Sequence, residues 1–111
     1  MDDVTARQLL DAERRRVEQL LSETTAAFDQ DRNTANETGD MADPAERLVA
    51  EGLDDALISG LRDRLEQIER AEARLSNGTF GRSVQSGLPI PEERLEADPA
   101  AELTVEEAAR Q

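Results

Sequence analysis

The chain of 111 residues contains no cysteine, histidine, tyrosine or tryptophan, and all 13 of its basic residues are arginine. Without cysteine there are no disulfides, and without cysteine and histidine the usual ligands of zinc are missing. Catalysis is restricted too, because nucleophiles and general bases can come only from carboxylates and hydroxyls. We therefore expect neither an enzyme nor a protein with a bound cofactor.

Long apolar runs and aromatic side chains are also scarce. No stretch is long enough to span a bilayer, and no segment has the form of a signal peptide, so the expected location is the cytoplasm. The two aromatic residues, Phe28 and Phe80, offer almost no surface on which nucleotide bases could stack. The formal charge of −13 further opposes direct binding of nucleic acid.

Acidic residues are what the sequence has in excess, with 26 Asp and Glu against 13 Arg. Such a surface suits a basic or metal-bearing protein partner, but acidity is equally typical of proteins adapted for solubility or high salt. The one basic cluster, Arg14 to Arg16, is not a patch, because consecutive residues on a helix point in different directions. We expect these arginines to form pairs four residues apart, such as Asp11–Arg15.

Two long segments have the apolar spacing of amphipathic helices. The first runs from about Val4 to Asn33 and has no Pro or Gly. Its stripe contains Leu10, Val17, Leu21 and Phe28. The second runs from Pro44 to about Ser76, where Asn77-Gly78 ends it. Its stripe contains Leu53, Leu57, Leu61, Leu65, Ile68 and Leu75. Residues 34–44 between them carry the helix breakers and predict a turn.

Each of these helices has one apolar stripe that needs a cover. The sequence therefore predicts an all-α protein in which residues 1–76 form a long antiparallel coiled-coil hairpin, with its tip at about residues 34–45. The alternative is a dimer of extended helices. The short connection favours pairing within one chain, and so a monomer.

Residues 77–111 form a second segment of different character, with Gly and Pro at short intervals. We predict a short helix over residues 92–97 and a final helix that begins at Thr104. Thr104 and Glu107 have the spacing of a capping box, in which each side chain bonds the other residue's backbone N–H.

This segment also carries a specific string of residues. It contains Gly81, then Gly87-Leu88-Pro89-Ile90-Pro91, then Arg94-Leu95-Glu96-Ala97-Asp98-Pro99. The string resembles the finger of the DksA/TraR family, bacterial proteins with a four-cysteine zinc finger at the base of a helical hairpin. The family's finger reads roughly G-x-C-x-x-C-G-x-x-I-P-x-x-R-L-x-A-x-P-x-x-x-x-C-x-x-C, and every landmark except the cysteines is present here.

The resemblance places the four missing cysteines at Ser83, Ser86, Thr104 and Glu107. One carboxylate and three hydroxyls are a poor ligand set for zinc, so we predict a finger-like module without metal. A small apolar core would then have to stabilise it. The expected members of that core are Phe80, Val84, Leu88, Ile90, Leu95, Leu103 and Val105.

The resemblance also assigns a role to the turn. In the family the hairpin enters the secondary channel of RNA polymerase, and its tip carries Asp-x-x-Asp-x-Ala near the catalytic Mg. Asp40, Asp43 and Ala45 have this spacing, which implies that they form the partner-binding tip. A register that starts at Asp43 is a weaker match, and Asp43 before Pro44 is also an ordinary helix cap.

The function implied by the resemblance is a transcription regulator that binds RNA polymerase without sequence-specific DNA contact. A nucleotide effector is implied as well, although the sequence assigns no residues to it. The alternative is a structural or adaptor coiled-coil protein that keeps the family shape but binds another protein or self-associates.

Overall fold

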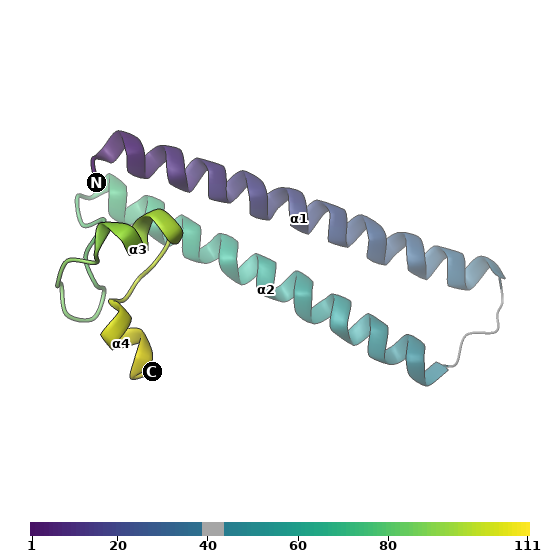
Figure 1. Cartoon of the computed structure of the whole chain (residues 1–111). Coiled ribbons are helices and arrows are strands. Elements are labelled where there is room, and N and C mark those ends of the chain that lie inside the picture. The colour runs from purple at the N-terminus through teal and green to yellow at the C-terminus, as the bar shows by residue number, and fades with distance from the viewer. Residues whose placement is uncertain (39–43) are drawn as a thin grey trace. The chain divides into compact units, whose positions relative to one another are not determined.

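The computed structural model describes the backbone of residues 1–38 and 44–111 and the side chains of residues 1–27, 52 and 54–111. In this part of the chain four helices follow one another: α1 (Asp3–Thr38), α2 (Pro44–Ser76), α3 (Glu92–Ala97) and α4 (Val105–Ala109) (Figure 1). None of the described helices is long and apolar enough to cross a membrane. The predicted all-α class is confirmed.

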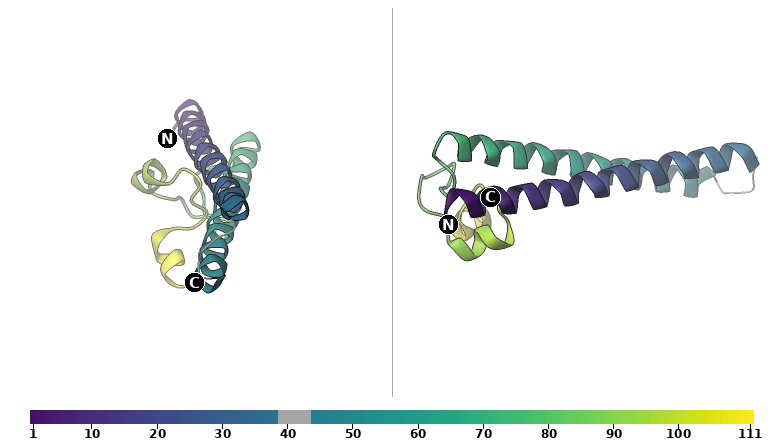
Figure 2. Two further views of the ribbon diagram at one scale, coloured as in Figure 1. Left: turned by 90° about the vertical axis from the view of Figure 1, so that its right-hand side faces the viewer. Right: turned by 90° about the horizontal axis from the view of Figure 1, so that it is seen from above.

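The chain forms two compact units. One consists of Met1–Arg15 together with Leu65–Gln111, and the other is Arg16–Arg64. In each unit a segment of α1 runs antiparallel to a segment of α2, so the long helices pair within one chain, as predicted. α3 and α4 belong to the first unit, where they lie beside the paired helix ends (Figure 2).

The first long helix continues further than predicted. α1 ends at Thr38 rather than near Asn33, so residues 34–38 are helical and do not belong to the turn. No Pro or Gly occurs between Val4 and Thr38, and nothing in this stretch forces a helix to stop. α2 begins at Pro44, as predicted, where the missing N–H of proline costs nothing.

The end of α2 is formed by the predicted Asn77-Gly78 pair. Gly78 has a φ of +81°, in the left-handed region that glycine adopts easily. The N–H of Thr79 then donates to the carbonyl of Arg74 at 2.8 Å. The two residues are the last and the first of six, as in the 6→1 hydrogen bond of a Schellman motif. This cap turns the chain sharply out of α2 and into the finger segment.

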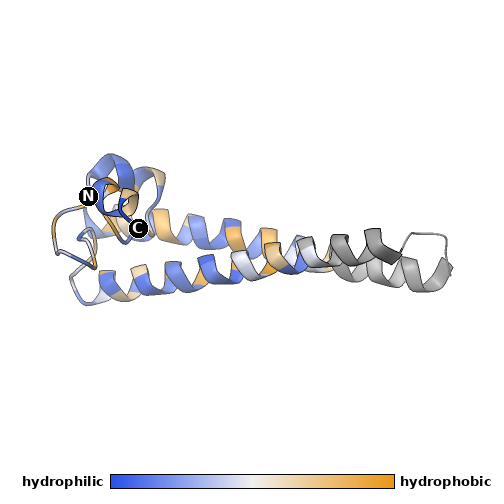
Figure 3. Ribbon diagram, turned by 90° about the horizontal axis from the view of Figure 1, so that it is seen from below, coloured by the Kyte–Doolittle hydropathy of each residue, from blue (hydrophilic) through white to orange (hydrophobic). Residues whose placement is uncertain are grey.

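In the second unit, the described part of the seam between α1 and α2 is centred on Val17 and Ile58, whose side chains are both buried. Leu21 and Leu61 are half-buried beside them. In the coloured parts of both helices, apolar residues recur at intervals among mostly hydrophilic ones (Figure 3). The helices therefore bury a narrow stripe and not a broad face.

The predicted stripe of α2 is wrong at one position. Leu57 is 52% exposed, whereas Ile58 is 8% exposed and takes its place in the seam. Ile58 lies one heptad before Leu65, so Ile58, Leu61, Leu65 and Ile68 follow one another in steps of three and four, which is the spacing of a coiled-coil seam. Leu57 flanks that seam and faces solvent.

In the first unit, the seam combines large and small side chains. Leu10 on α1 and Ile68 on α2 are fully buried, together with Ala6 and Ala71, whose small size lets the two backbones approach. Arg14 on α1 also donates to Glu72 on α2, with Nε 3.4 Å from Oε2. The basic cluster therefore contributes a cross-helix pair to Glu72.

The core of the finger segment differs from the prediction. Ile90 and Leu95 are buried, as expected, but Val84, Leu88 and Val105 are 56%, 59% and 54% exposed. Smaller residues are buried in this segment instead, namely Pro99, Ala100 and Ala101. Thr104, the N-cap of α4, and Glu107 on its first turn are buried, whereas Val105 at the first position of the helix is exposed.

We expect Ile58→Ala to destabilise the protein by about 2 kcal/mol or more, because it leaves a cavity in the seam. The flanking variant Leu57→Ala is the matched control and should change the free energy of unfolding by no more than about 0.5 kcal/mol. Denaturant unfolding followed by far-UV circular dichroism measures both. Equal losses for the two variants would contradict the seam assignment.

Candidate functional site

The residues predicted to bind a partner fall at the connection between α1 and α2. Asp40 and Asp43 lie outside the described residues, and Ala45 is the second residue of α2 with its side chain also outside them. The helix bounds leave residues 39–43 to join the two long helices. The partner-binding role of Asp40, Asp43 and Ala45 stays a prediction.

The finger segment begins with a turn that two glycines make possible. Gly81 and Gly87 have φ values of +87° and +74°, which explains why the resemblance contains glycine at both positions. Between them the backbone doubles back, so that Arg82 pairs with Pro89 in an isolated bridge. The N–H of Ser83 donates to the carbonyl of Leu88 at 2.8 Å.

The predicted capping box is present at the start of α4. The Thr104 N–H donates to Glu107 Oε1 at 2.9 Å, and the Glu107 N–H donates to Thr104 Oγ1 at 3.2 Å. Both side chains are buried, each 7% exposed. Two of the four positions that carry cysteine in the family therefore hold each other at the start of a helix.

The other two positions shape the turn that precedes α3. Ser83 Oγ accepts N–H bonds from Gln85 at 3.1 Å and from Ser86 at 3.2 Å. Ser86 Oγ accepts the N–H of Leu88 at 3.2 Å. The hydroxyls of both serines also favour the charged form of the Glu107 carboxylate and lower its pKa.

These bonds keep Glu107 ionised. The hydroxyl of Ser83 has the largest effect and the N–H of Thr104 the next, and together they lower the pKa of Glu107 from 4.5 to about 2. Partial burial acts in the opposite direction and is outweighed, since a carboxylate that accepts several hydrogen bonds is stabilised in its charged form. We call Ser83, Ser86, Thr104 and Glu107 the Glu107 cluster.

The Glu107 cluster does not fit a zinc ion. Ser83 Oγ and Thr104 Oγ1 already accept backbone N–H groups, so a cation would have to displace these bonds to reach the oxygens. Three neutral hydroxyls and one carboxylate also lack the thiolate and imidazole donors that zinc prefers. Within the described residues, no group of three or more His, Cys, Asp or Glu side chains is arranged to hold a metal.

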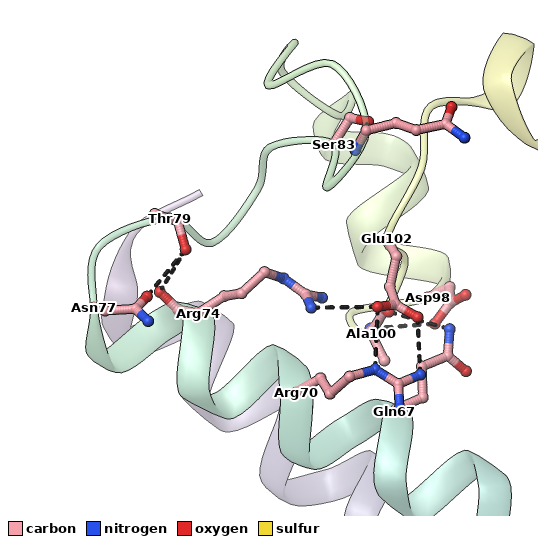
Figure 4. A network of polar contacts seen from close by, with 10 residues as sticks. Gln67, Arg70, Arg74, Asn77, Thr79, Ser83, Asp98, Ala100 and Glu102 are labelled. Atoms are coloured by element: carbon pink, nitrogen blue, oxygen red, sulfur yellow. Dashed lines mark hydrogen bonds and ion pairs between the residues drawn. The ribbon is translucent and has the colours of Figure 1, made fainter.

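A second polar cluster joins the finger segment to α2 (Figure 4). The guanidinium of Arg70 donates twice to Glu102, at 3.1 and 3.2 Å, and Arg74 Nη1 lies 3.5 Å from the same carboxylate. Gln67, one turn earlier on α2, donates to the carbonyl of Ala100 at 3.3 Å. Three residues on one face of α2 thus hold the chain between Pro99 and Leu103.

Arg74 is the most buried cation of this second cluster. Its side chain is 14% exposed, and its Nη2 atom is buried without a hydrogen-bond partner. Burial lowers the pKa of Arg74, and the nearby charge of Glu102 opposes that change. The hydrogen bonds from Arg70 to Glu102 raise the pKa of Arg70. Glu102 therefore neutralises two guanidinium groups, one of them largely removed from water.

The sequence did not reveal this second cluster. Arg70 and Arg74 are four residues apart on a helix, as many surface arginines are, and Glu102 follows about thirty residues later without a motif of its own. Their pairing depends on how the finger segment folds back along α2, which local sequence patterns do not encode.

The chain is similar to several characterised proteins, although no protein-family model matches it. Over 78 residues, or 67% of the chain, it is 38% identical to the RNA polymerase-binding transcription factor DksA of Caulobacter vibrioides. Over 63 residues, or 56% of the chain, it is 40% identical to general stress protein 16O of Bacillus subtilis. The matches span 54% and 39% of these relatives, so the chain covers about half of their length or less.

The whole fold has a counterpart as well. The structure of transcription factor DksA2 from Pseudomonas aeruginosa superposes with a TM-score of 0.81 and 26% identity, over 98% of this chain and 81% of that chain. The fold and the finger landmarks define an all-helical hairpin protein with a finger module. The chain belongs to the DksA/TraR family, as a member whose finger cysteines are replaced.

We expect Glu102→Ala to destabilise the finger segment by about 1–3 kcal/mol, because it leaves the buried guanidinium of Arg74 without its carboxylate. Arg70→Ala should cost about 1 kcal/mol or less, since Arg70 is half exposed and Arg74 keeps its partner. Hydrogen exchange of residues 98–104 measures both variants. A larger loss of protection in Arg70→Ala than in Glu102→Ala would contradict this ranking.

The Glu107 cluster predicts a pH dependence. The carboxylate has a pKa of about 2 in the folded protein and an ordinary value of 4.5 when unfolded, so it stabilises the fold fully above pH 4.5. That stability is lost as the pH falls toward 2. The NMR shift of the Thr104 amide should therefore titrate near pH 2 and not near 4.5. Glu107→Gln should abolish the titration, and a wild-type midpoint near 4.5 would speak against the cluster.

Proposed function

We propose that this protein regulates transcription by binding RNA polymerase. The observation that carries the proposal is its 38% identity, over 78 residues, to a protein named as an RNA polymerase-binding transcription factor. The fold shared with transcription factor DksA2 over 98% of the chain supports it. The match spans 54% of the length of that relative.

The proposed mode of action is entry of the helical hairpin into the secondary channel of the polymerase, with Asp40, Asp43 and Ala45 near the active centre. Two carboxylates within six residues can pair with basic side chains or act on a metal-bound centre through water. The small side chain of Ala45 would permit close approach. The motif spacing supports the assignment, as does the location of Asp40 and Asp43 between α1 and α2 and of Ala45 in the first turn of α2.

Contact with protein and not with DNA fits the surface chemistry. The chain has a formal charge of −13, which opposes approach to a phosphate backbone. An acidic surface instead favours association with basic protein surfaces, and it accelerates the encounter at low salt. We therefore propose that promoters are affected through the polymerase, without sequence-specific DNA binding by this chain.

The proposal predicts that the protein binds purified bacterial RNA polymerase and alters transcription initiation in vitro. Asp40→Asn/Asp43→Asn should weaken the effect at least roughly tenfold, because it removes the two proposed contact charges. Binding by pull-down and initiation by transcript quantification measure the outcome. The matched control is Asp55→Asn/Asp63→Asn, which removes two exposed carboxylates from the body of α2 and should behave like the wild type.

Two outcomes would contradict the proposal at different levels. A tip variant that still acts fully would refute the assignment of Asp40 and Asp43 but leave the polymerase as partner. Absence of polymerase binding at micromolar concentration, together with dimeric sedimentation, would instead favour the alternative of an adaptor coiled-coil protein.

A further inference from the structure

The end of α2 carries the one asparagine of this chain that a glycine follows. Asn33 and Asn36 precede larger residues, whereas Asn77 precedes Gly78. Asn77 directly follows the last residue of α2, and Asn77, Gly78 and Thr79 are all exposed. The Asn-Gly pair is therefore open to water at the point where the chain turns out of α2 into the finger segment.

The backbone nitrogen of Gly78 is accessible and unbonded. Gly78 has no side chain to shield this nitrogen, and a Cβ built there would meet nothing within 4 Å. The N–H groups of the residues on either side donate to the carbonyls of Ala73 and Arg74, at 3.0 and 2.8 Å. Among the described residues, the N–H of Gly78 itself has no acceptor. Its nitrogen is thus free to react with the side chain that precedes it.

The hydroxyl of Thr79 contacts the carboxamide of Asn77 (Figure 4). Thr79 Oγ1 lies 3.0 Å from Asn77 Oδ1 and 3.5 Å from the carbonyl oxygen of Arg74, so the carboxamide oxygen is its closer acceptor. A hydroxyl that donates to a carbonyl oxygen stabilises the negative charge that develops there when a nucleophile attacks the carbon. The turn therefore places an unbonded nitrogen and a polarised carboxamide in consecutive residues.

We propose that Asn77 is a site of deamidation and isomerisation, assisted by the hydroxyl of Thr79. Hydroxide removes the amide proton of Gly78, and the nitrogen attacks Cγ of Asn77 to form a five-membered cyclic imide. The bond between Cγ and the carboxamide nitrogen breaks, and this nitrogen leaves as ammonia after it takes a proton from water. Water then opens the imide at either carbonyl. Cleavage at Cγ gives aspartate, and cleavage at the backbone carbonyl carbon gives isoaspartate.

Isoaspartate changes the cap of α2, because it adds a methylene to the backbone between residue 77 and Gly78. The 6→1 hydrogen bond from the Thr79 N–H to the Arg74 carbonyl spans this linkage. Arg74 also pairs through Nη1 with Glu102 at 3.5 Å, so the residue that accepts the cap bond is one of those that attach the finger segment to α2. Formation of isoaspartate therefore loosens the finger segment, whereas aspartate leaves the length of the backbone unchanged.

The proposal is independent of polymerase binding, and its test follows the chemistry of the full-length protein during incubation at mildly alkaline pH. Peptide mass spectrometry should find Asn77 converted at least roughly tenfold faster than Asn33 and Asn36, since a side chain shields the nitrogen that follows each of these internal controls. Electron-transfer fragmentation distinguishes the two products, and both aspartate and isoaspartate should form. Hydrogen exchange of residues 79–104 should be faster in the fraction that contains isoaspartate.

Two variants separate the roles of the side chains. Asn77→Gln is the matched control, because it keeps a carboxamide but its longer side chain would have to close a less favourable six-membered ring, and it should stay unconverted. Thr79→Val removes the hydroxyl and keeps the shape of the side chain. Its conversion at Asn77 should be at least roughly threefold slower than in the wild type. Far-UV circular dichroism shows that the long helices of each variant remain folded.

Three results would overturn the proposal. Conversion of Asn77 no faster than that of Asn33 and Asn36 would show that the cap protects the Asn-Gly pair. Aspartate without isoaspartate would show that the reaction does not pass through the cyclic imide. Conversion in Thr79→Val at the wild-type rate or above, with the long helices intact, would show that the hydroxyl does not assist the attack.

Discussion

The pairing of two narrow apolar stripes is the constraint on which the rest of this structure depends. Each long helix carries a narrow apolar stripe, and each stripe is removed from water only when the other helix packs against it. The side chains of Val17 and Ile58 are buried in one unit, and those of Leu10 and Ile68 are buried in the other. The strongly acidic surface contributes nothing to this burial, so the seam has to be continuous and correctly phased.

The finger segment solves a different problem, because it is too short for a core of large side chains. It buries Ile90 and Leu95 and otherwise relies on polar groups with complete partners. The Thr104/Glu107 capping box starts α4, and Glu102 attaches the segment to α2 through Arg70 and Arg74. Both carboxylates are partly or largely buried, which is tolerable because Glu102 pairs with two guanidinium groups and Glu107 accepts the N–H of Thr104.

Much of this arrangement follows from local sequence signals. Pro44 and Gly78 mark the bounds of α2, and the Thr104/Glu107 spacing identifies the start of α4, because capping and φ preferences act within a few residues. The prediction that Leu57 lies in the seam is wrong because Leu57 and its apolar neighbour Ile58 fit the apolar stripe of an isolated helix almost equally well. The seam is decided by the partner helix, which the pattern of one helix does not contain.

The finger core was harder to predict for a related reason. Val84, Leu88 and Val105 are apolar in a short segment and were expected to be buried, yet the buried positions next to them belong to Ser83, Thr104 and Glu107. Whether an apolar side chain is buried depends on the direction that the backbone gives it. In this segment the turn at Ser83 and the cap at Thr104 direct polar side chains into the interior. The family landmarks located these positions, but only the folded chain shows which groups they bond.

The contrast between the two units bears on the proposed function. In the unit Arg16–Arg64, Gly52 and Gly60 each lower helix stability by about 1 kcal/mol relative to alanine. A Cβ added at either position would meet nothing within 4 Å, so packing does not require the glycines. The unit that contains the finger has ion pairs, caps and the two polar clusters in addition to its seam. The two glycines thus weaken α2 in the unit that carries the connection proposed to bind the polymerase, and low local stability is common in binding elements.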